Sequence, residues 1–595
     1  MTRLRVLPAV MATLFGPALG GCNETASEDP GASSTRRLAD EVAAVEAEAT
    51  GMASAAPAGT PAPEAPEELP REALEGLGYL GSGEVQQGGN EVRGAVRSRA
   101  RRTSALVQAA ARPTPEPEPA DREGYARIDA SPFIDTRQDP RSTFSVDVDT
   151  ASYANVRRFL LGERRRPPAD AVRLEEMVNY FRYASGQAPP REHPVAVDVE
   201  VRACPWNTDH ELLRVGLRTA PLGLDGGPPR NLTFLLDVSG SMGSPDKLPL
   251  LKRSLALLTH DLREQDRVAM VVYAGASGLV LPPTSGSERG TILAALDRLQ
   301  AGGSTAGAAG LELAYRTARE GFQRGGINRV ILATDGDFNV GPSSEGELTR
   351  LIEEHRRSGV FLTVLGFGRG NLQDARMEAL ADRGNGNYAY VDSLAEARKV
   401  LVREAGGTLV TVAQDVKLQL EMNPARVARH RLLGYENRRL AHRDFRDDTK
   451  DAGEMGAGHE VTAFYEIVPV GAPDAASGDD VPGLRYQEDA PAPGPDPSGG
   501  SELAFVRVRY QPPGGGEGRE LSVPVASPSA EALAMPGSEA FRFGAAVAGF
   551  ALALREDPVA RPSLSALRTL AAGAVGDDPH GERRELLRMI DVARD

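Results

Sequence analysis

The stretch Leu232-Thr-Phe-Leu-Leu-Asp237-Val-Ser239-Gly-Ser241-Met242 decides the fold of this 595-residue chain. Its first five residues are mainly apolar without a regular polar alternation, which is typical of a strand buried on both faces of a parallel sheet. The run ends on the carboxylate of Asp237, and hydroxyls follow at Ser239 and Ser241. An apolar-rich helical segment, Lys247 to Leu258, comes next. These polar residues are therefore predicted at the carboxyl end of a strand, where open α/β sheets bind their ligands.

Two later stretches carry similar polar residues. Gly302-Gly-Ser-Thr305-Ala-Gly307 is a Gly-rich loop between two predicted helices, and Thr305 supplies a third hydroxyl. Arg329-Val-Ile-Leu-Ala-Thr334 is a second buried strand, and it ends on Asp335-Gly-Asp337, which supplies a second carboxylate. Such oxygens are hard donors that suit Mg²⁺, Mn²⁺ or Ca²⁺ better than Zn²⁺. Each of these hydroxyls, taken alone, could equally cap the following helix.

Taken together, these residues form a constellation that resembles the metal-ion-dependent adhesion site of von Willebrand factor A domains. That site combines a DxSxS motif, a Thr in a Gly-rich loop and a TDG motif, and all five positions match: Asp237, Ser239, Ser241, Thr305 and Asp335. The resemblance implies that both serines bind a divalent cation directly, Mg²⁺ first with Mn²⁺ or Ca²⁺ as alternatives, and that the aspartates act partly through water. It also implies that a partner protein's Asp or Glu carboxylate completes the coordination.

Strands and helices alternate across residues 229–405, which predicts a doubly wound, mainly parallel α/β sheet of the Rossmann-like kind. No Gly-x-Gly-x-x-Gly opens the first helix, and no Lys follows a Gly-rich phosphate loop, so the sequence does not support nucleotide binding. Further strands are predicted at 267–273, 279–281, 360–365 and 388–391, and further helices at 289–299, 306–319, 345–356, 371–383 and 394–402.

The segments on both sides of this domain alternate polar and apolar residues, as half-buried antiparallel strands do. We therefore expect one β-sandwich-like region into which the α/β domain is inserted. Its predicted strands lie at 196–201, 212–217, 408–422, 461–468 and 504–510, and a separate strand is predicted at 143–149. Helices are predicted before the strands at 151–161 and 172–183, and near the C-terminus at 541–554, 564–571 and 582–592, the first of these three being amphipathic.

Four motifs outside the domain have a family resemblance. Phe144-Ser-Val-Asp-Val-Asp-Thr-Ala-Ser-Tyr153 and Arg173-Leu-Glu-Glu-Met-Val-Asn-Tyr-Phe181 resemble the module that precedes the A domain in a group of bacterial von Willebrand factor A lipoproteins. Arg431-Leu-Leu-Gly-Tyr-Glu-Asn-Arg-Arg-Leu440 and Phe445-Arg-Asp-Asp448 resemble the module that follows it. The resemblance covers the chain from about Phe133 to its last residue.

The first residues resemble a bacterial lipoprotein signal. Arginines at positions 3 and 5 precede a short apolar segment, which ends in Leu19-Gly-Gly-Cys22. By this resemblance to the lipobox, Cys22 becomes the lipidated first residue of the mature protein and anchors it to a membrane. No Asp follows Cys22 directly, which favours the outer membrane by analogy with lipoprotein sorting. An ordinary secretory signal is the alternative. Cys204 is the only other cysteine, so we expect it to be a small buried residue.

The predicted organisation is a signal peptide and lipobox at 1–22, a disordered tether at 23–130, an N-terminal module at 131–228, the A domain at 229–405, a β-rich module at 406–530 and a helical segment at 531–595. The tether is rich in Ala, Glu, Pro, Gly, Ser and Arg and cannot build a core. The formal net charge of −15 makes the chain a poor non-specific binder of nucleic acid.

These features predict a non-enzymatic, cation-dependent protein-binding lipoprotein of the bacterial envelope. One alternative is an envelope scaffold with a vestigial metal site. Another is a serine hydrolase using Ser241, Asp335 and His355, although the first Gly of the nucleophile elbow is replaced by Ser239. The pair Asp147 and Asp149 suggests a phosphatase, but Ala151 stands where that motif needs Thr or Val, so we expect a structural role for the pair.

Overall fold

The computed structural model describes residues 123–183, 188–190, 192–221, 227–303, 307–336, 345–404, 410–450, 452–475 and 500–594. Cys22, Thr305 and Asp337 lie outside the described residues, as do the predicted signal peptide at 1–22 and positions 23–122 of the predicted tether. In the described part of the chain, no helix is both long enough and apolar enough to cross a membrane.

A six-stranded sheet forms the middle of the chain, with the strand order β10-β9-β8-β5-β6-β7. The strands pair in parallel except for β7, which runs antiparallel to β6 at one edge. Every residue of the two central strands, β5 and β8, is buried, as the apolar runs predict. The strands are β5 (Arg230–Asp237), β6 (Arg267–Tyr273), β7 (Ser277–Ser285), β8 (Ile327–Thr334), β9 (Phe361–Phe367) and β10 (Tyr388–Val391).

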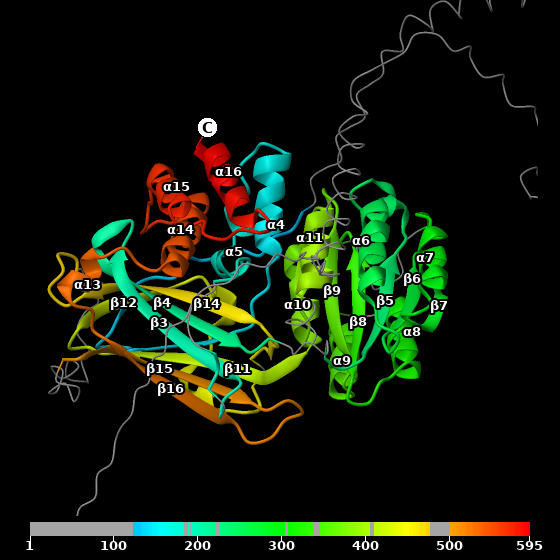
Figure 1. Ribbon diagram of the computed structural model, residues 1–595, viewed down its shortest axis with the longest axis horizontal. Helices are drawn as coiled ribbons and strands as arrows, with labels where there is room; N and C mark the ends of the chain where they lie inside the picture. The colour runs from blue at the N-terminus through cyan, green and yellow to red at the C-terminus, as the bar shows by residue number, and fades with distance from the viewer. Residues whose placement is uncertain are drawn as a thin grey trace, which may run out of the picture. The chain divides into compact units, whose positions relative to one another are not determined.

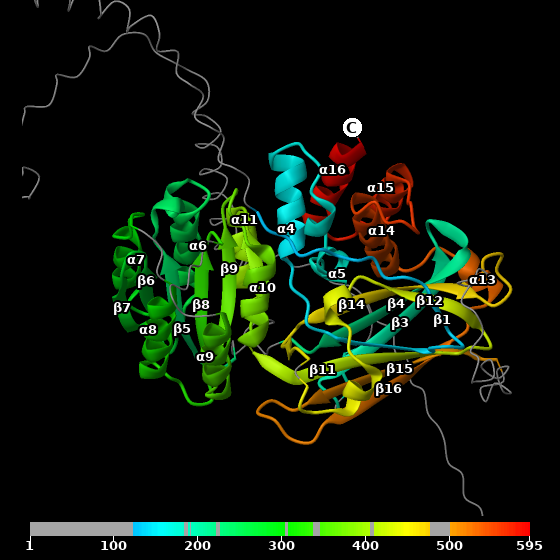
Figure 2. The ribbon, with the colours of Figure 1, turned by 180° about the vertical axis from the view of Figure 1, so that it is seen from behind.

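Helices cover both faces of this sheet (Figures 1 and 2). One apolar cluster joins the sheet to α6, α7 and α11, and a second joins the opposite face to α8, α9 and α10. Strand β5 contributes side chains to both clusters, since Phe234 packs in the first and Leu235 in the second. The predicted doubly wound sheet is therefore confirmed. The helices are α6 (Leu248–Asp261), α7 (Arg289–Asp297), α8 (Gly307–Glu320), α9 (Glu345–Arg357), α10 (Asp374–Arg383) and α11 (Leu394–Arg398), which a π-helical turn (Lys399–Arg403) extends.

Two antiparallel sheets form the sandwich. The first has the order β1-β12-β14-β4-β3, and the second has the order β13-β11-β15-β16, with β2 also paired to β11. One apolar cluster contains residues of both sheets, so they share a core. Strand β4 lies before the α/β domain in the sequence and pairs with β14, which lies after it, with Val215 opposite Ala463. The predicted insertion of the α/β domain is thus confirmed. The strands are β1 (Ile134–Asp135), β2 (Arg141–Ser145), β3 (Val195–Cys204), β4 (Asn207–Thr219), β11 (Thr411–Met422), β12 (Val427–Leu433), β13 (Met455–Gly456), β14 (Glu460–Pro469), β15 (Glu502–Gln511) and β16 (Arg519–Ala526).

A helical layer joins the two ends of the described chain in one apolar cluster. Its central helix is α14, and the prediction that this helix is amphipathic is wrong, because nearly all its residues are buried. Two glycines permit this close packing, since a Cβ at Gly544 would meet the ring of Phe464 and one at Gly549 would meet Leu567. The helices are α4 (Ala151–Arg157), continued by a π-helical turn (Arg158–Gly162), α5 (Leu174–Asn179), α13 (Ala530–Ala534), α14 (Glu539–Leu554), α15 (Leu564–Ala572) and α16 (Glu582–Arg594).

Three arginines connect the flanking modules to carboxylates of the α/β domain: Arg157 and Arg173 are buried, and the side chain of Arg438 is 11% exposed. Each guanidinium binds two carboxylates of that domain, so side chains on α10, on α11 and just after β10 are held against the modules. Buried charges of this kind are stable only when paired. The pairs are Arg157 with Asp392 (2.5 Å) and Glu396 (2.7 Å), Arg173 with Asp374 (2.9 Å) and Glu378, and Arg438 with Asp382 (2.6 Å) and Glu378 (3.0 Å).

Candidate metal-binding site

The DxSxS motif occupies the turn between β5 and α6. Asp237 is the last residue of β5 and is fully buried, Ser239 is 2 % exposed, and Ser241 lies exposed in a short 3-10 turn. The Asp237 Oδ1 atom accepts a hydrogen bond from the backbone N–H of Ser239 at 2.9 Å. Its Oδ2 atom accepts hydrogen bonds from the hydroxyls of Tyr273 and Thr334, each at 3.1 Å. The buried carboxylate of Asp237 therefore supports the turn through hydrogen bonds, while Ser241 is exposed at the surface.

The two serine hydroxyls lie side by side. Their Oγ atoms are 3.0 Å apart. Neighbouring oxygens in an octahedral Mg²⁺ shell, with bonds of about 2.0–2.1 Å, are about 2.9 Å from each other. The two hydroxyls share a hydrogen bond in this structure, and the same spacing also fits two adjacent ligands of one Mg²⁺ ion.

The Gly-rich loop approaches this turn. Gly302 donates its backbone N–H to the carbonyl of Val238 at 2.8 Å, and Gly240 donates to the carbonyl of Gly303 at 3.1 Å. Gly303 has a φ of +86°, a conformation that favours glycine. The structure thus brings the described end of this loop against the DxSxS turn, although Thr305 itself is among the residues that are not described.

Asp335 follows β8 and is 1 % exposed. The next residue, Gly336, has a φ of +103°, and a Cβ there would overlap the backbone of Asn371 and Gln373, which explains the glycine of the TDG motif. Burial raises the pKa of the Asp237 carboxyl above its ordinary value, and the charge of Asp335 contributes to the rise. Two buried carboxylates near each other favour a cation between them.

Lys247 supplies a cation that sequence reasoning missed. Its Nζ atom lies 2.8 Å from Asp335 Oδ2, and both side chains are buried. The aliphatic part of the lysine packs on Gly368, where a φ of +76° and the absence of a Cβ leave room for it. The available signal was the position of Lys247 directly before the first helix, close in sequence to the DxSxS motif. The positive charge of this lysine reaches into the candidate metal site.

The donors present here fit a divalent cation. In the part of the chain that the structure describes, no group of three or more His, Cys, Asp or Glu side chains could hold a metal ion. The candidate site instead combines two carboxylates with hydroxyls, which is a donor set for Mg²⁺ and not for Zn²⁺. Asp237, Ser239, Ser241 and Asp335 would hold such an ion, and the cation would present a positive charge at the exposed edge of the sheet.

A surface groove adjoins the site. It begins at Met242 and Gly243 in the DxSxS turn and runs between α6 and α7, with a volume of about 580 Å³. Its wall is mainly apolar and includes Leu248, Leu296 and Leu299. A ligand that reaches Ser241 would therefore lie beside an apolar surface.

The other residues that the sequence singled out lie elsewhere. Asp147 and Asp149 both contact Arg438, at 3.2 and 3.5 Å, and Asp149 also accepts the backbone N–H of Tyr388 at 2.7 Å. His355 stacks on the ring of Tyr315 with a centroid distance of 4.2 Å, and it has no described contact with the DxSxS turn. Cys204 is free and buried, as expected. Burial raises the pKa of its thiol well above the ordinary value.

Three protein families match successive parts of this chain. A family described as "von Willebrand factor" matches residues 119–214. The von Willebrand factor type A domain matches residues 231–403, which contain the six-stranded sheet and the candidate site. A family described as "Uncharacterized protein YfbK, C-terminal" matches residues 407–595.

Individual proteins show the same similarity. The "Uncharacterized protein YfbK" of Escherichia coli (strain K12) is 44% identical over 476 residues, covering 79% of this chain and 80% of that protein. Among solved structures, a von Willebrand factor type A protein from Catenulispora acidiphila is 16% identical with a TM-score of 0.35, covering 68% of this chain and 91% of that one. The ArnB paralog VWA2 from Sulfolobus acidocaldarius is 14% identical with a TM-score of 0.32, covering 68% of this chain and 98% of that one.

Proposed function

The chain belongs to the YfbK family and contains a von Willebrand factor type A domain. We propose that it is a non-enzymatic, divalent-cation-dependent protein-binding lipoprotein of the bacterial envelope. The observation that carries this proposal is the depth at which the donor groups of the site lie. The carboxylates of Asp237 and Asp335 are buried, while the hydroxyl of Ser241 is exposed above them. A cation held there is accessible from outside on one side only.

The partner offers an Asp or Glu carboxylate to the cation. Such a contact joins a full negative charge to a partly desolvated positive one, which makes it stronger than an ordinary surface ion pair. The apolar groove beside Met242 and Leu248 supports a partner segment in which an acidic residue is flanked by apolar side chains. The acidic balance of the chain argues against nucleic acid as the partner.

The enzyme alternative has less support. A serine hydrolase needs a base within hydrogen-bonding reach of its nucleophile. His355, the base that the order of residues suggests, packs on Tyr315 instead. A fluorophosphonate probe that labels Ser241 would favour the hydrolase. The scaffold alternative differs in another way, because a vestigial site gives no cation effect on stability.

Membrane attachment through lipid on Cys22 is part of the proposal, with the outer membrane as the expected location. Its support is the lipobox-like sequence that ends at this cysteine. Metabolic labelling with a radioactive fatty acid tests it in the native organism. Labelled protein in outer-membrane fractions, with no label in the Cys22→Ala variant, is the expected result. Label that persists in this variant contradicts the attachment site.

Thermal unfolding of the metal-stripped protein tests cation binding, because a ligand that binds only the folded state raises its stability. We expect Mg²⁺ or Mn²⁺ to raise the melting temperature of the wild-type chain and to have little effect on Ser241→Ala. Ser241 is a better test than Asp237, whose three hydrogen bonds also support the fold. Ser287→Ala, an exposed serine of the same domain, is the matched control and should respond like the wild type.

The partner is then sought by affinity capture from envelope extract in Mg²⁺ and in EDTA. Proteins retained by the wild type in Mg²⁺, and lost both in EDTA and with Ser241→Ala, fit the proposal. A partner that binds equally in EDTA would show that the cation site does not mediate binding.

A further inference from the structure

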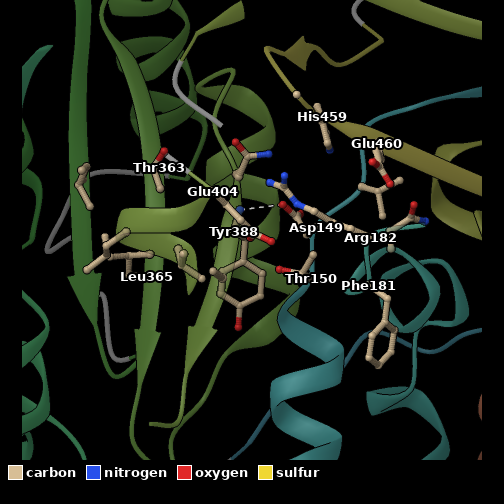
Figure 3. A pocket seen from close by; sticks show the side chains of 18 of the residues that line it. Asp149, Thr150, Phe181, Arg182, Thr363, Leu365, Tyr388, Glu404, His459 and Glu460 are labelled. Carbon is tan, nitrogen blue, oxygen red and sulfur yellow. Dashed lines mark hydrogen bonds between the residues drawn. The ribbon is translucent and has the colours of Figure 1, made fainter. Parts of the chain in front are cut away.

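A second polar cavity lies at the other end of the α/β sheet, between that domain and the sandwich. Its volume is about 330 Å³, and its lining includes Arg329 from β8, Asn387 before β10, and His459 before β14. Asn387 and His459 also line an adjoining, smaller pocket of about 90 Å³. Figure 3 shows this smaller pocket, with His459 facing Thr363 of β9 across it. Both structural parts of the chain therefore contribute polar side chains to the cavity.

Arg329 is the unusual member of this lining. It is only 1 % exposed, and its Nη1 atom donates a hydrogen bond to the hydroxyl of Thr363 at 2.7 Å. Its Nε atom is buried without a hydrogen-bond partner. Among the described residues no carboxylate lies within ion-pair distance of this guanidinium, whereas the arginines that connect the modules each have two or more. A buried charge without a counter-ion strongly destabilises a fold.

Three carboxylates of described residues line the cavity, and none of them forms an ion pair with Arg329. Asp147 and Asp382 pair with Arg438 instead, at 3.2 and 2.6 Å. Glu454 acts on Arg329 electrostatically, but its two oxygens accept hydrogen bonds from Asn385 at 2.7 Å and Thr411 at 3.1 Å. Burial lowers the pKa of Arg329 to about 10, so the guanidinium stays positive at neutral pH. The cavity thus contains a fixed positive charge that lies over the ring of Phe361, 5.7 Å from its centroid. The Nε–Nη2 edge of this guanidinium has no hydrogen-bond partner among the described residues.

His459 adds a neutral polar group. Burial lowers the pKa of its imidazole to about 4, with the charge of Arg182 contributing, so the ring is uncharged near neutral pH. Its Nδ1 atom is buried and has no hydrogen-bond partner. A neutral imidazole can donate one hydrogen bond from this atom in the appropriate tautomer. Two unpartnered buried nitrogens, on Arg329 and His459, therefore belong to the same cavity.

We propose that this cavity binds a small oxyanion, a carboxylate or a phosphate group, on the Nε–Nη2 edge of Arg329, with His459 and Asn387 as additional polar contacts. Guanidinium recognises planar or tetrahedral oxyanions with two parallel N–H···O bonds, which a lysine cannot do. The anion would touch both the α/β domain and the sandwich, so its binding stabilises their contact. This site is distinct from the metal site and does not depend on the function proposed above.

Anion-dependent stability of the full chain tests this site. Sodium phosphate, sulfate and acetate are titrated at constant ionic strength against sodium chloride, with metal-stripped protein in chelator-free buffer, so that neither a divalent cation nor the carboxylates of a chelator contribute. At about 100 times the dissociation constant, we expect the melting temperature to rise by roughly 3–6 °C. A response to phosphate alone identifies a phosphate-type ligand, and a response to acetate alone identifies a carboxylate. No rise beyond chloride with any of the three overturns the proposal.

Variants locate the effect. Arg329→Met should abolish the anion response, while Arg383→Met should keep it, because Arg383 lines the same cavity but its side chain is 61% exposed and pairs with Glu353. Arg329→Lys covers the case in which Arg329→Met does not fold, since it keeps the charge and loses the bidentate geometry. We expect it to bind about tenfold more weakly than the wild type. An unchanged affinity in Arg329→Lys or Arg329→Met would contradict the assignment.

Discussion

Replacing Lys247 by Met should tighten Mg²⁺ binding at the candidate metal site. The Nζ atom of Lys247 lies 2.8 Å from Asp335 Oδ2, and the two side chains are 10% and 0% exposed. A cation bound by Asp335 would lie close to this ammonium group and be repelled by it. The lysine must then either move away or remain in place and weaken cation binding. Met has a similar length without the charge, so Lys247→Met removes the competition and keeps the packing on Gly368.

The magnitude follows from the pair's geometry. Two unit charges about 4 Å apart, near a protein surface, attract by about 4 kcal/mol. Displacement of Lys247 loses this attraction, but the released ammonium recovers hydration, which offsets part of the loss. If a third to two thirds of the lost attraction is not recovered, Mg²⁺ binding is weakened by about 1.3–2.7 kcal/mol. This corresponds to a roughly 10–90-fold change in the dissociation constant.

Isothermal titration of the metal-stripped protein with Mg²⁺, supported by Mn²⁺ binding measured by electron paramagnetic resonance, gives the affinities. Lys252→Met is the matched control, because Lys252 lies on α6, which Lys247 directly precedes, and its Nζ atom contacts backbone carbonyls of Asp297 and Leu299 rather than a carboxylate. The metal-free Lys247→Met protein should also melt earlier than the wild type, with Mg²⁺ restoring it. Equal or weaker Mg²⁺ binding by Lys247→Met, with Lys252→Met unchanged, would refute the reasoning.

Three further predictions concern the fold. Gly386→Ala should lower the free energy of unfolding by about 2–4 kcal/mol in chemical denaturation, because the new Cβ would overlap the carbonyl oxygen of Leu362; a loss below 1 kcal/mol would contradict this. Arg431→Ala should lower the free energy of unfolding by about 3–5 kcal/mol in the same assay, because it removes an ion-pair partner that lies 2.9 Å from the buried carboxylate of Glu466. Burial acts to lower the pKa of His210, but its hydrogen bond with Glu466 outweighs burial and the pKa is raised. The stability difference between the wild type and His210→Asn should therefore be largest below about pH 6.5 and should decrease as the pH rises through the raised pKa. Melting curves in which the difference grows with pH would contradict this.

The sequence predicted the α/β domain well because its strands and helices follow simple hydrophobic patterns. β6 and β10 have the predicted bounds, and β5 ends at Asp237 as expected. Strands that are buried on both faces give uninterrupted apolar runs, and turns with special backbone geometry require glycine, as at Gly336. These two rules place Asp237 and Asp335 at the ends of buried strands, whereas the metal-binding role of these residues and of Ser239 and Ser241 came from the resemblance to the family motif.

The sandwich was harder to predict because charged residues are buried in it. Strand β12 contains His430 and Arg431, which are 0% and 1% exposed, and the partner of Arg431 is Glu466 on the neighbouring β14. Without the pairing, the segment resembles a polar loop, so its strand was missed. β16 was missed for another reason, since Pro524 interrupts its pattern; proline is acceptable there because β16 is an edge strand. Long-range pairing of this kind is not visible in local periodicity.

The same limit applies to charges around the sites. The position of Lys247 next to Asp335 depends on the packing of α6 beside β8, which no short motif encodes. The isolation of Arg329 depends on the sandwich lying against the start of β8. For neither lysine nor arginine does the local sequence predict the electrostatic environment. The ion pair of Lys247 with Asp335, and the absence of a described ion-pair partner for Arg329, both result from tertiary packing.

Strand β8 connects these two observations. It is buried along its whole length, so charged groups can be accommodated only where loops or other elements provide partners near its ends. At its carboxyl end, the negative charge of Asp335 meets the positive charge of Lys247. Near its amino end, the positive charge of Arg329 meets a hydroxyl and no carboxylate among the described residues. Asp335 lies six positions after Arg329, so about 20 Å of extended strand separates the two residues. The two ends of β8 therefore bind ions differently. At the carboxyl end a cation must displace the charge of Lys247, whereas at the amino end an anion would neutralise the charge of Arg329. Anion binding should therefore be unchanged in Lys247→Met.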